Sequence, residues 1–266
     1  MLQPTGQRRR RPSSGAPGSG KSRITSRRKA RDTIAPRLAQ TEPGELNRYY
    51  ERLLAEYGPQ GWWPAKSRLE VILGAILTQN TNWRNAALAI GQLRKAGLIN
   101  LRNLSRTKES ELEPLIRSTG FFRQKARTIV TFVRWFEEHH QGSLRRMFEQ
   151  PAEKLRSALL KVRGLGPETA DAILLYAGNR PMFVADAYTR RILARHGLLA
   201  HNARYAEAQD FIHWRLKPDA RVYNEFHALL VEAGKQHCMR HAPRCGGCPL
   251  EEFLPSAVHV PAGPAP

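Results

Sequence analysis

The sequence has few acidic residues and no long hydrophobic run. It has 23 Asp plus Glu against 43 Lys plus Arg, which gives a formal net charge of +20. Half of this excess lies in residues 1–40, and the rest of the chain carries the other half. A globular part this basic favours a polyanionic partner, with nucleic acid first, because an acidic small molecule needs only a few charges. The longest apolar run, Val71 to Leu77, is far below the roughly 20 residues of a membrane span, so no membrane partner is expected.

Cysteine is also scarce. The three cysteines, Cys238, Cys245 and Cys248, lie within eleven residues. Such an odd, clustered set is a poor disulfide framework and a better set of ligands. No secretory signal pattern opens the chain. These features predict a reducing, cytoplasmic location, associated with the nucleoid in a bacterium.

Residues 1–40 are rich in Arg, Ser, Gly and Pro, and we expect a disordered basic arm. An Arg- and Ser-rich segment that is poor in acids is also typical of organelle import, and that alternative stays open. The arm contains GAPGSGKS at residues 15–22, which matches a phosphate-binding P-loop. That motif needs a buried strand before it, and the basic segment at residues 8–14 cannot be one, so we interpret the match as chance.

From Pro43 onward, apolar residues recur at helical spacing, and neither strand alternation nor an internal repeat is present. The fold class is therefore predicted to be all-α. Residues 255–266, rich in Pro, Ala and Gly, are predicted to be disordered. Helices are expected near residues 46–54, 69–77, 86–93, 112–116, 121–136, 152–162, 167–177, 185–196, 203–214 and 222–234.

The strongest local signal is LKVRGLGPETA, from Leu160 to Ala170. It predicts a helix, a turn at Gly164-Leu165-Gly166, and a new helix beginning at Pro167. The free N–H groups and the positive end of the second helix suit a DNA phosphate. An ordinary helix–helix turn is the alternative.

The region from Trp62 to Leu250 resembles the helix-hairpin-helix DNA glycosylases of the endonuclease III superfamily. The resemblance rests on the hairpin, the cysteine cluster and three further segments: ILTQNT (76–81), GFFRQKA (120–126) and VADAYTRR (184–191). It implies two helical domains with a DNA-binding cleft between them. Residues 67–182 would form a six-helix barrel with the hairpin, and residues 41–66 plus 183–254 the other domain. It also implies a monomer that binds double-stranded DNA containing a damaged base.

Within this resemblance, Asp186 matches the catalytic aspartate. A carboxylate there would stabilise oxocarbenium character on the sugar and orient or deprotonate water. The alternative is an acid that stabilises a helix N-terminus. The hairpin residues expected to contact DNA are Gly164, Leu165, Gly166, Glu168 and Thr169.

Bifunctional members of the family carry a Schiff-base lysine where this chain has Glu168. A carboxylate forms no imine, so a monofunctional enzyme is predicted. Another amine at Lys125, Lys161 or Lys235 is the alternative.

Trp62, Trp63 and Trp83 resemble the pocket aromatics of the 3-methyladenine glycosylase branch, where they form or flank the site of the extruded base. An alkylated purine is cationic or electron-poor and stacks well on indoles. Packing in the core or between domains is the alternative. Gln79 aligns with a residue that fills the gap left by the flipped nucleotide, or else it caps a helix end.

Cys238, Cys245 and Cys248 match the first three ligands of the family's C-x6-C-x2-C-x5-C iron–sulfur loop, whose fourth position is Leu254 here. Three readings stay open: a 4Fe–4S cluster with a foreign fourth ligand (His237, His241 or His259), zinc held by three Cys and one His, or no metal. Arg240, His241 and Arg244 would contact phosphates in each case.

The function predicted from the sequence is a monofunctional DNA glycosylase of base-excision repair that hydrolyses the bond to an alkylated purine of the 3-methyladenine type. The alternatives are a bifunctional glycosylase/lyase for oxidised pyrimidines, a non-catalytic DNA-binding protein, and a glycosylase for mismatched thymine or uracil.

Overall fold

The computed structural model describes residues 44–255. The predicted basic arm with its P-loop match, and the predicted tail beyond Pro255, lie outside this range. Within it all regular secondary structure is helical and no β-strand is present, which confirms the all-α prediction. None of the helices in this range combines the length and the apolar character needed to cross a membrane.

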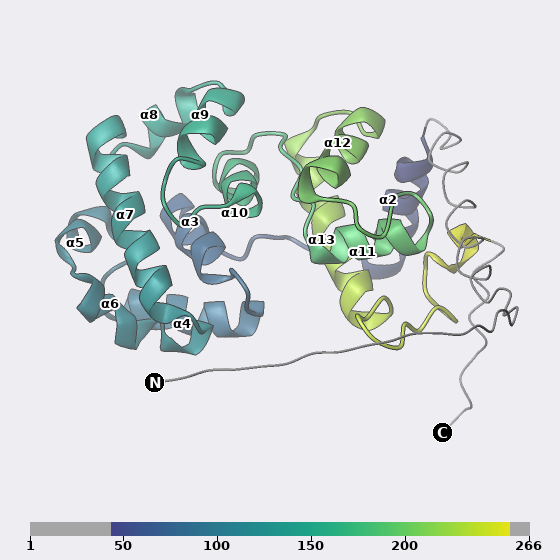
Figure 1. Ribbon diagram of the computed structural model, residues 1–266, viewed down its shortest axis with the longest axis horizontal. Helices are drawn as coiled ribbons and strands as arrows, with labels where there is room; N and C mark the ends of the chain where they lie inside the picture. The colour runs from purple at the N-terminus through teal and green to yellow at the C-terminus, as the bar shows by residue number, and fades with distance from the viewer. Residues whose placement is uncertain (1–43, 256–266) are drawn as a thin grey trace, which may run out of the picture.

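The helices form two groups, which Figure 1 shows side by side. The first group runs from α3 to α10, and the second joins α2 to the three last α-helices. The first contains α3 (Arg68–Leu77), α4 (Trp83–Lys95), α5 (Leu101–Arg106), α6 (Glu109–Leu115), α7 (Phe122–His140), α8 (Leu144–Glu149), α9 (Ala152–Leu159) and α10 (Pro167–Ala172). The second contains α2 (Glu45–Tyr57), α11 (Ala187–Arg195), α12 (Tyr205–Arg215) and α13 (Ala220–Gln236).

The second group is assembled from distant parts of the sequence. Helix α2 packs against α12 and α13, while α11 packs against both of these last helices. In the first group, α3 is central, with every residue from Leu69 to Leu77 buried. This group has two more helices than the barrel implied by the resemblance, because the short α5 and α8 join it. The exact domain boundaries stay a prediction.

Polar side chains set where several helices begin. The Ser67 hydroxyl accepts a hydrogen bond from the Glu70 amide at the start of α3, and Asn82 accepts one from the Asn85 amide at the start of α4. Such N-caps satisfy amides that have no partner inside the helix. Helix α4 therefore begins at Trp83, earlier than its apolar pattern alone predicts.

Helix α10 changes type after its sixth residue. The predicted helix over 167–177 exists, but Ile173–Ala177 form a π-helical turn, in which the Gly178 amide donates to the Ile173 carbonyl at 3.0 Å. Turns of this type are rare and occur frequently at functional sites. This one carries Tyr176.

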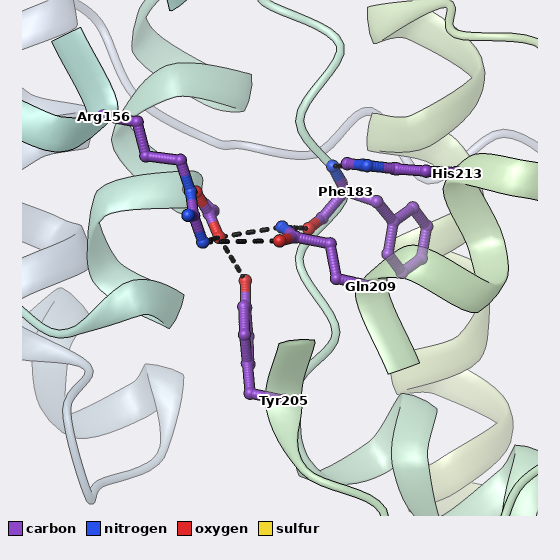
Figure 2. Close-up of polar contacts among 6 residues, drawn as sticks. Arg156, Phe183, Tyr205, Gln209 and His213 are labelled. Atoms are coloured by element: carbon purple, nitrogen blue, oxygen red, sulfur yellow. Dashed lines mark hydrogen bonds and ion pairs between the residues drawn. The ribbon is translucent and has the colours of Figure 1, made fainter. Parts of the chain in front are cut away.

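A buried polar network joins the two groups of helices (Figure 2). Asp171 of α10 is fully buried, and its carboxylate accepts two hydrogen bonds from the Arg156 guanidinium, at 2.6 and 2.9 Å. From α12, Tyr205 Oη and Gln209 Nε2 each donate to Asp171 Oδ2 at 2.8 Å. The charge is thus compensated inside the protein by donors from two helices, α9 and α12.

The same network holds the segment that leads to α11. Gln209 Nε2 also donates to the Phe183 carbonyl at 2.6 Å, and the Phe183 amide donates to His213 Nε2 at 3.0 Å (Figure 2). Both backbone groups of Phe183 are therefore fixed by α12. Because Asp186 follows three residues later, the network also fixes the approach to the predicted catalytic residue.

Candidate active site

The hairpin between α9 and α10 has the predicted shape. Gly164 has a φ of 96°, a left-handed conformation that side chains rarely adopt. A Cβ atom there would lie 2.1 Å from Thr128 Oγ1 of α7. Gly166 differs, because its backbone is extended and a Cβ atom would meet nothing within 4 Å. Gly164 is therefore required by packing and conformation, whereas Gly166 leaves the start of α10 open to a ligand.

The other predicted hairpin residues divide by exposure. Leu165 and Thr169 are buried, while Gly164, Gly166 and Glu168 are exposed. Their contact with DNA stays a prediction.

Gln79 connects the end of α3 to this hairpin. Its side-chain amide donates to the Gly164 carbonyl and to Thr169 Oγ1, both at 2.9 Å. The alternative role of closing α3 belongs instead to Thr78, whose hydroxyl donates to the Gly74 carbonyl at 2.9 Å. Filling the gap left by a flipped nucleotide stays a prediction for Gln79.

The three predicted tryptophans form one cluster. Ring centroids are 4.9 Å apart for Trp62 and Trp83, 5.0 Å for Trp62 and Trp63, and 5.1 Å for Trp63 and Trp83. Trp63 also packs against α3, where a Cβ atom on Gly74 would lie 2.9 Å from its Cζ2 atom. All three rings are half-buried, so they pack together and still present surface to a ligand.

A pocket of about 440 Å³ brings most of the predicted site residues together. This volume is typical of small-molecule sites. Its lining comes from both helix groups, so the pocket lies between them. The predicted site residues that line it are Trp62, Trp63, Gln79, Trp83, Glu168, Thr169 and Asp186, whereas Gly164, Leu165 and Gly166 do not.

Asp186 uses its two carboxylate oxygens differently. Oδ1 accepts a hydrogen bond from the Thr189 amide at 2.8 Å and so caps α11, as the alternative interpretation expects. Oδ2 lies 3.7 Å from Nε2 of His227 at the pocket wall. Burial by itself raises the pKa of Asp186, but His227 and the Thr189 amide outweigh it, and the net effect lowers that pKa. The group is therefore a carboxylate at neutral pH, and it lines the pocket together with His227.

Sequence reasoning missed His227 and Tyr176, which both line the pocket. Tyr176 Oη lies 2.5 Å from His227 Nδ1, and its ring is 5.1 Å from that of Trp63. In the sequence, His227 is one polar residue inside an apolar helix, and no local spacing connects it to Asp186. The signal that could have identified it is a histidine at a buried position of α13, among apolar residues.

Glu168 lies at the rim of the pocket. Partial withdrawal from water and the nearby Asp186 carboxylate raise its pKa, while His227 and Arg190 act in the opposite direction. Two acids of opposite pKa shift therefore share one site, a pattern that enzymes use to separate acid and base roles.

The three lysines considered as alternative amines have different surroundings. Lys125 is buried in the first helix group, where its ammonium donates to the carbonyls of Leu77 and Thr119 at 2.9 and 2.7 Å. Neither Lys125 nor Lys161 lines the pocket, but Lys235 does, and its Nζ lies 3.2 Å from Glu232 Oε2.

The cysteine loop follows α13, and its three thiols line one small cavity together with Leu254. A 4Fe–4S cluster normally takes four thiolates, and the sequence has three cysteines. Over residues 44–255, no group of three or more Cys, His, Asp or Glu side chains is placed to hold a single metal ion. The residues do not fit a cluster held by four thiolates, and cluster binding stays a prediction.

Arginines of α11 hold this loop in place. Arg191 Nε donates to the Cys238 carbonyl and Arg195 Nη1 to the Met239 carbonyl, both at 2.7 Å. Arg195 Nη1 also lies 3.1 Å from Cys238 Sγ. The predicted phosphate contacts on the loop, all exposed, are Arg240, His241 and Arg244.

Comparison with known proteins shows which proteins this chain is similar to. A sequence profile described as HhH-GPD superfamily base excision DNA repair protein matches residues 73–217. A Methanocaldococcus jannaschii protein named as a candidate DNA repair glycosylase is 40% identical over 210 residues, covering 78% of this chain and 94% of that protein.

Similar solved structures include a 3-methyladenine DNA glycosylase and an endonuclease III. The 3-methyladenine DNA glycosylase of H. pylori, bound to 1,N6-ethenoadenine, has a TM-score of 0.64 and 28% identity, covering 74% of this chain and 98% of that chain. An endonuclease III trapped covalently on DNA has a TM-score of 0.69 and 19% identity, covering 80% and 95% of the two chains. At the second identity the likeness shows the fold alone.

The profile spans more than half of the chain, and the M. jannaschii relative matches over almost its whole length. The hairpin and the segment before α11, which carry the resemblance seen in the sequence, meet around one pocket. The chain belongs to the HhH-GPD superfamily of base excision DNA repair proteins.

Proposed function

We propose that this protein is a monofunctional DNA glycosylase that releases an alkylated purine from double-stranded DNA, acting as a monomer. One observation carries the proposal: the Asp186 carboxylate and the three-tryptophan cluster line the same pocket, and Glu168 stands where a lyase would have its lysine. The similarity to a 3-methyladenine glycosylase supports the choice of lesion.

The pocket chemistry is consistent with such a substrate. Stacking on indole rings favours a base that is cationic or electron-poor. A base of this kind already has a weakened bond to the sugar, so a carboxylate that stabilises the oxocarbenium character needs no strong acid beside it. In the proposed reaction Asp186 also accepts a proton from the attacking water, and the electron pair of the broken bond leaves with the base.

The decisive experiment is a base-release assay on duplexes that contain an alkylated, a deaminated or an oxidised base. We expect release of the alkylated purine, with an abasic strand that stays intact. Asp186→Asn should slow release by at least about 100-fold while binding the duplex as well as the wild type. If no lesion yields free base although the duplex is bound equally by both proteins, the protein is a DNA-binding module and the proposal is wrong.

A bifunctional glycosylase/lyase is the second candidate, favoured by the amine of Lys235 in the pocket lining. It predicts that borohydride traps a covalent adduct between wild-type protein and an oxidised-pyrimidine duplex, and that Lys235→Met abolishes the adduct. The monofunctional proposal predicts no adduct in either case.

A further inference from the structure

The pocket contains an imidazole between a phenol and the predicted catalytic carboxylate. The π turn supplies Tyr176, α13 supplies His227, and the N-cap of α11 supplies Asp186. Tyr176 Oη lies 2.5 Å from His227 Nδ1, and His227 Nε2 lies 3.7 Å from Asp186 Oδ2. The histidine side chain is only 10% exposed, so these two neighbours define its polar environment.

The carboxylate that faces the imidazole indicates which nitrogen holds the proton. An ionised carboxylate only accepts hydrogen bonds, so the nitrogen that faces Asp186, Nε2, is the one that carries a proton toward it. Burial, followed by the negative charges of Asp186 and Glu168, raises the pKa of Tyr176 well above its ordinary value, so a protonated hydroxyl is present to donate to Nδ1. The Nε2–H of a neutral imidazole thus faces Asp186.

The separation of Nε2 and Oδ2 is too long for a direct hydrogen bond. Nε2 is buried and has no hydrogen-bond partner among the residues that the structure describes. A buried polar atom of this kind requires a partner, and Asp186 Oδ2 is the acceptor that it faces. A small side-chain movement would bring the two atoms within hydrogen-bond distance. His227 and Asp186 both line the pocket, so this contact would form at its wall.

We propose that His227 is a positioning residue for Asp186: the Nε2–H donates to Oδ2 when the substrate is bound, and so fixes the carboxylate that accepts the proton of the attacking water. This inference rests on the proposed glycosylase function. In the reaction, the bond from the water oxygen to C1′ forms, the C1′–N bond breaks with its electron pair going to the base, and the water proton passes to Asp186. A cationic alkylated purine leaves as a neutral base, so no further proton is required.

Other charged groups also face this pair. Glu168 of α10 and Arg190 of α11 act electrostatically on the site, and Lys235 of α13 lies on the same pocket wall. Phe183 contributes only an aromatic edge, with ring centroids 6.2 Å apart. All of these charged residues therefore contribute to the pH dependence of the reaction. The role of His227 has to be measured directly on its imidazole ring.

The kinetic test compares His227→Phe, His227→Gln and the matched control His140→Phe. His140 is a buried histidine of α7 outside the pocket, held by Gln150. We expect His227→Phe to lower the single-turnover rate of base release by about 100-fold with an unchanged Kd for duplex. His227→Gln, which keeps an N–H donor, should restore part of the rate, and the control should match the wild type. Wild-type rates in both His227 variants, or an equal loss in the control, would overturn the proposal.

The second measurement does not depend on activity. Nitrogen-detected NMR of the imidazole should show neutral His227 protonated on Nε2, and Tyr176→Phe should weaken this preference. Asp186→Asn should shift the Nε2 signal, because the carboxylate is removed. A proton on Nδ1 in the wild type would refute the positioning role. Failure of the wild type to release any base, with this NMR pattern intact, would refute the glycosylase proposal while leaving the geometry of the pair established.

Discussion

At the scale of single residues, Asp186 combines a structural task with the proposed chemical task in one carboxylate. Oδ1 caps α11 and Oδ2 faces His227, so the two tasks use different atoms. Asparagine has the oxygen needed for the first task and lacks the charge needed for the second. Alanine lacks both.

Substitutions at Asp186 should therefore separate stability from catalysis. Asp186→Ala is expected to lower the free energy of unfolding by about 1 kcal/mol through loss of the cap, whereas Asp186→Asn stays close to the wild type. Both should slow base release by at least about 100-fold. Urea denaturation and the base-release assay, run on the same preparations, check the two halves. Equal stability of the two variants would show that the cap is energetically unimportant.

Lys125 offers a test at alkaline pH. Burial lowers its pKa to about 8, from an ordinary value of 10.5. Between these values the unfolded chain binds more protons than the folded protein, so the stability of the wild type rises with pH relative to Lys125→Met. Urea denaturation of both proteins below, within and above this window measures the difference. A constant difference across the window would mean that the buried amine keeps its ordinary pKa.

At the scale of elements, the hairpin depends on its two glycines for different reasons. Gly164 needs a left-handed backbone and the absence of a Cβ atom beside Thr128, whereas Gly166 has neither constraint. The two positions thus form a natural pair of test and control.

Gly164→Ala is expected to destabilise the protein by about 2 kcal/mol or more, because conformational strain adds to the clash. Gly166→Ala should change the unfolding free energy by less than about 1 kcal/mol. If the amides at the start of α10 bind a phosphate, Gly166→Ala should still weaken duplex binding. Thermal unfolding and fluorescence anisotropy with labelled duplex measure the two effects. Equal destabilisation by both substitutions would refute this division.

Some of the helices could be predicted from the sequence and others could not. The hydrophobic spacing predicted the longer helices, because burial of one helix face determines both the spacing of the apolar residues and the packing of the helix. It missed α5 and α8, whose six residues carry little periodicity and whose starts depend on caps from Asn100 and Ser143. The π turn has no compositional signature. His227 was missed because its contacts with Tyr176 and Asp186 join residues that only the folded chain brings together.

At the scale of the whole molecule, the Asp171 network is a polar connection between the two helix groups, as is the contact of Tyr176 with His227. Its members come from α9, α10 and α12, and they also hold the segment that precedes Asp186. Since the pocket is lined from both groups, this network bears on the shape of the pocket as well as on stability.

Removing Arg156 should show this coupling. Arg156→Met leaves the fully buried Asp171 without its cationic partner and is expected to cost about 3 kcal/mol. The double variant Arg156→Met/Asp171→Asn, which removes both charges, should be more stable than this single variant. Chemical denaturation of the four proteins completes a double-mutant cycle. Strict additivity of the two changes would show that the pair does not interact.

The π turn after α10 has a consequence for comparison among relatives. Such a turn accommodates one residue more than a regular helical turn of the same span. Deleting a single amino acid there would restore α-helical winding and rotate Tyr176 away from the imidazole and the indole that it now touches. Natural homologues shorter by one position at this point are expected to lack the contacts of this tyrosine with the imidazole and the indole, even where every other pocket residue is the same.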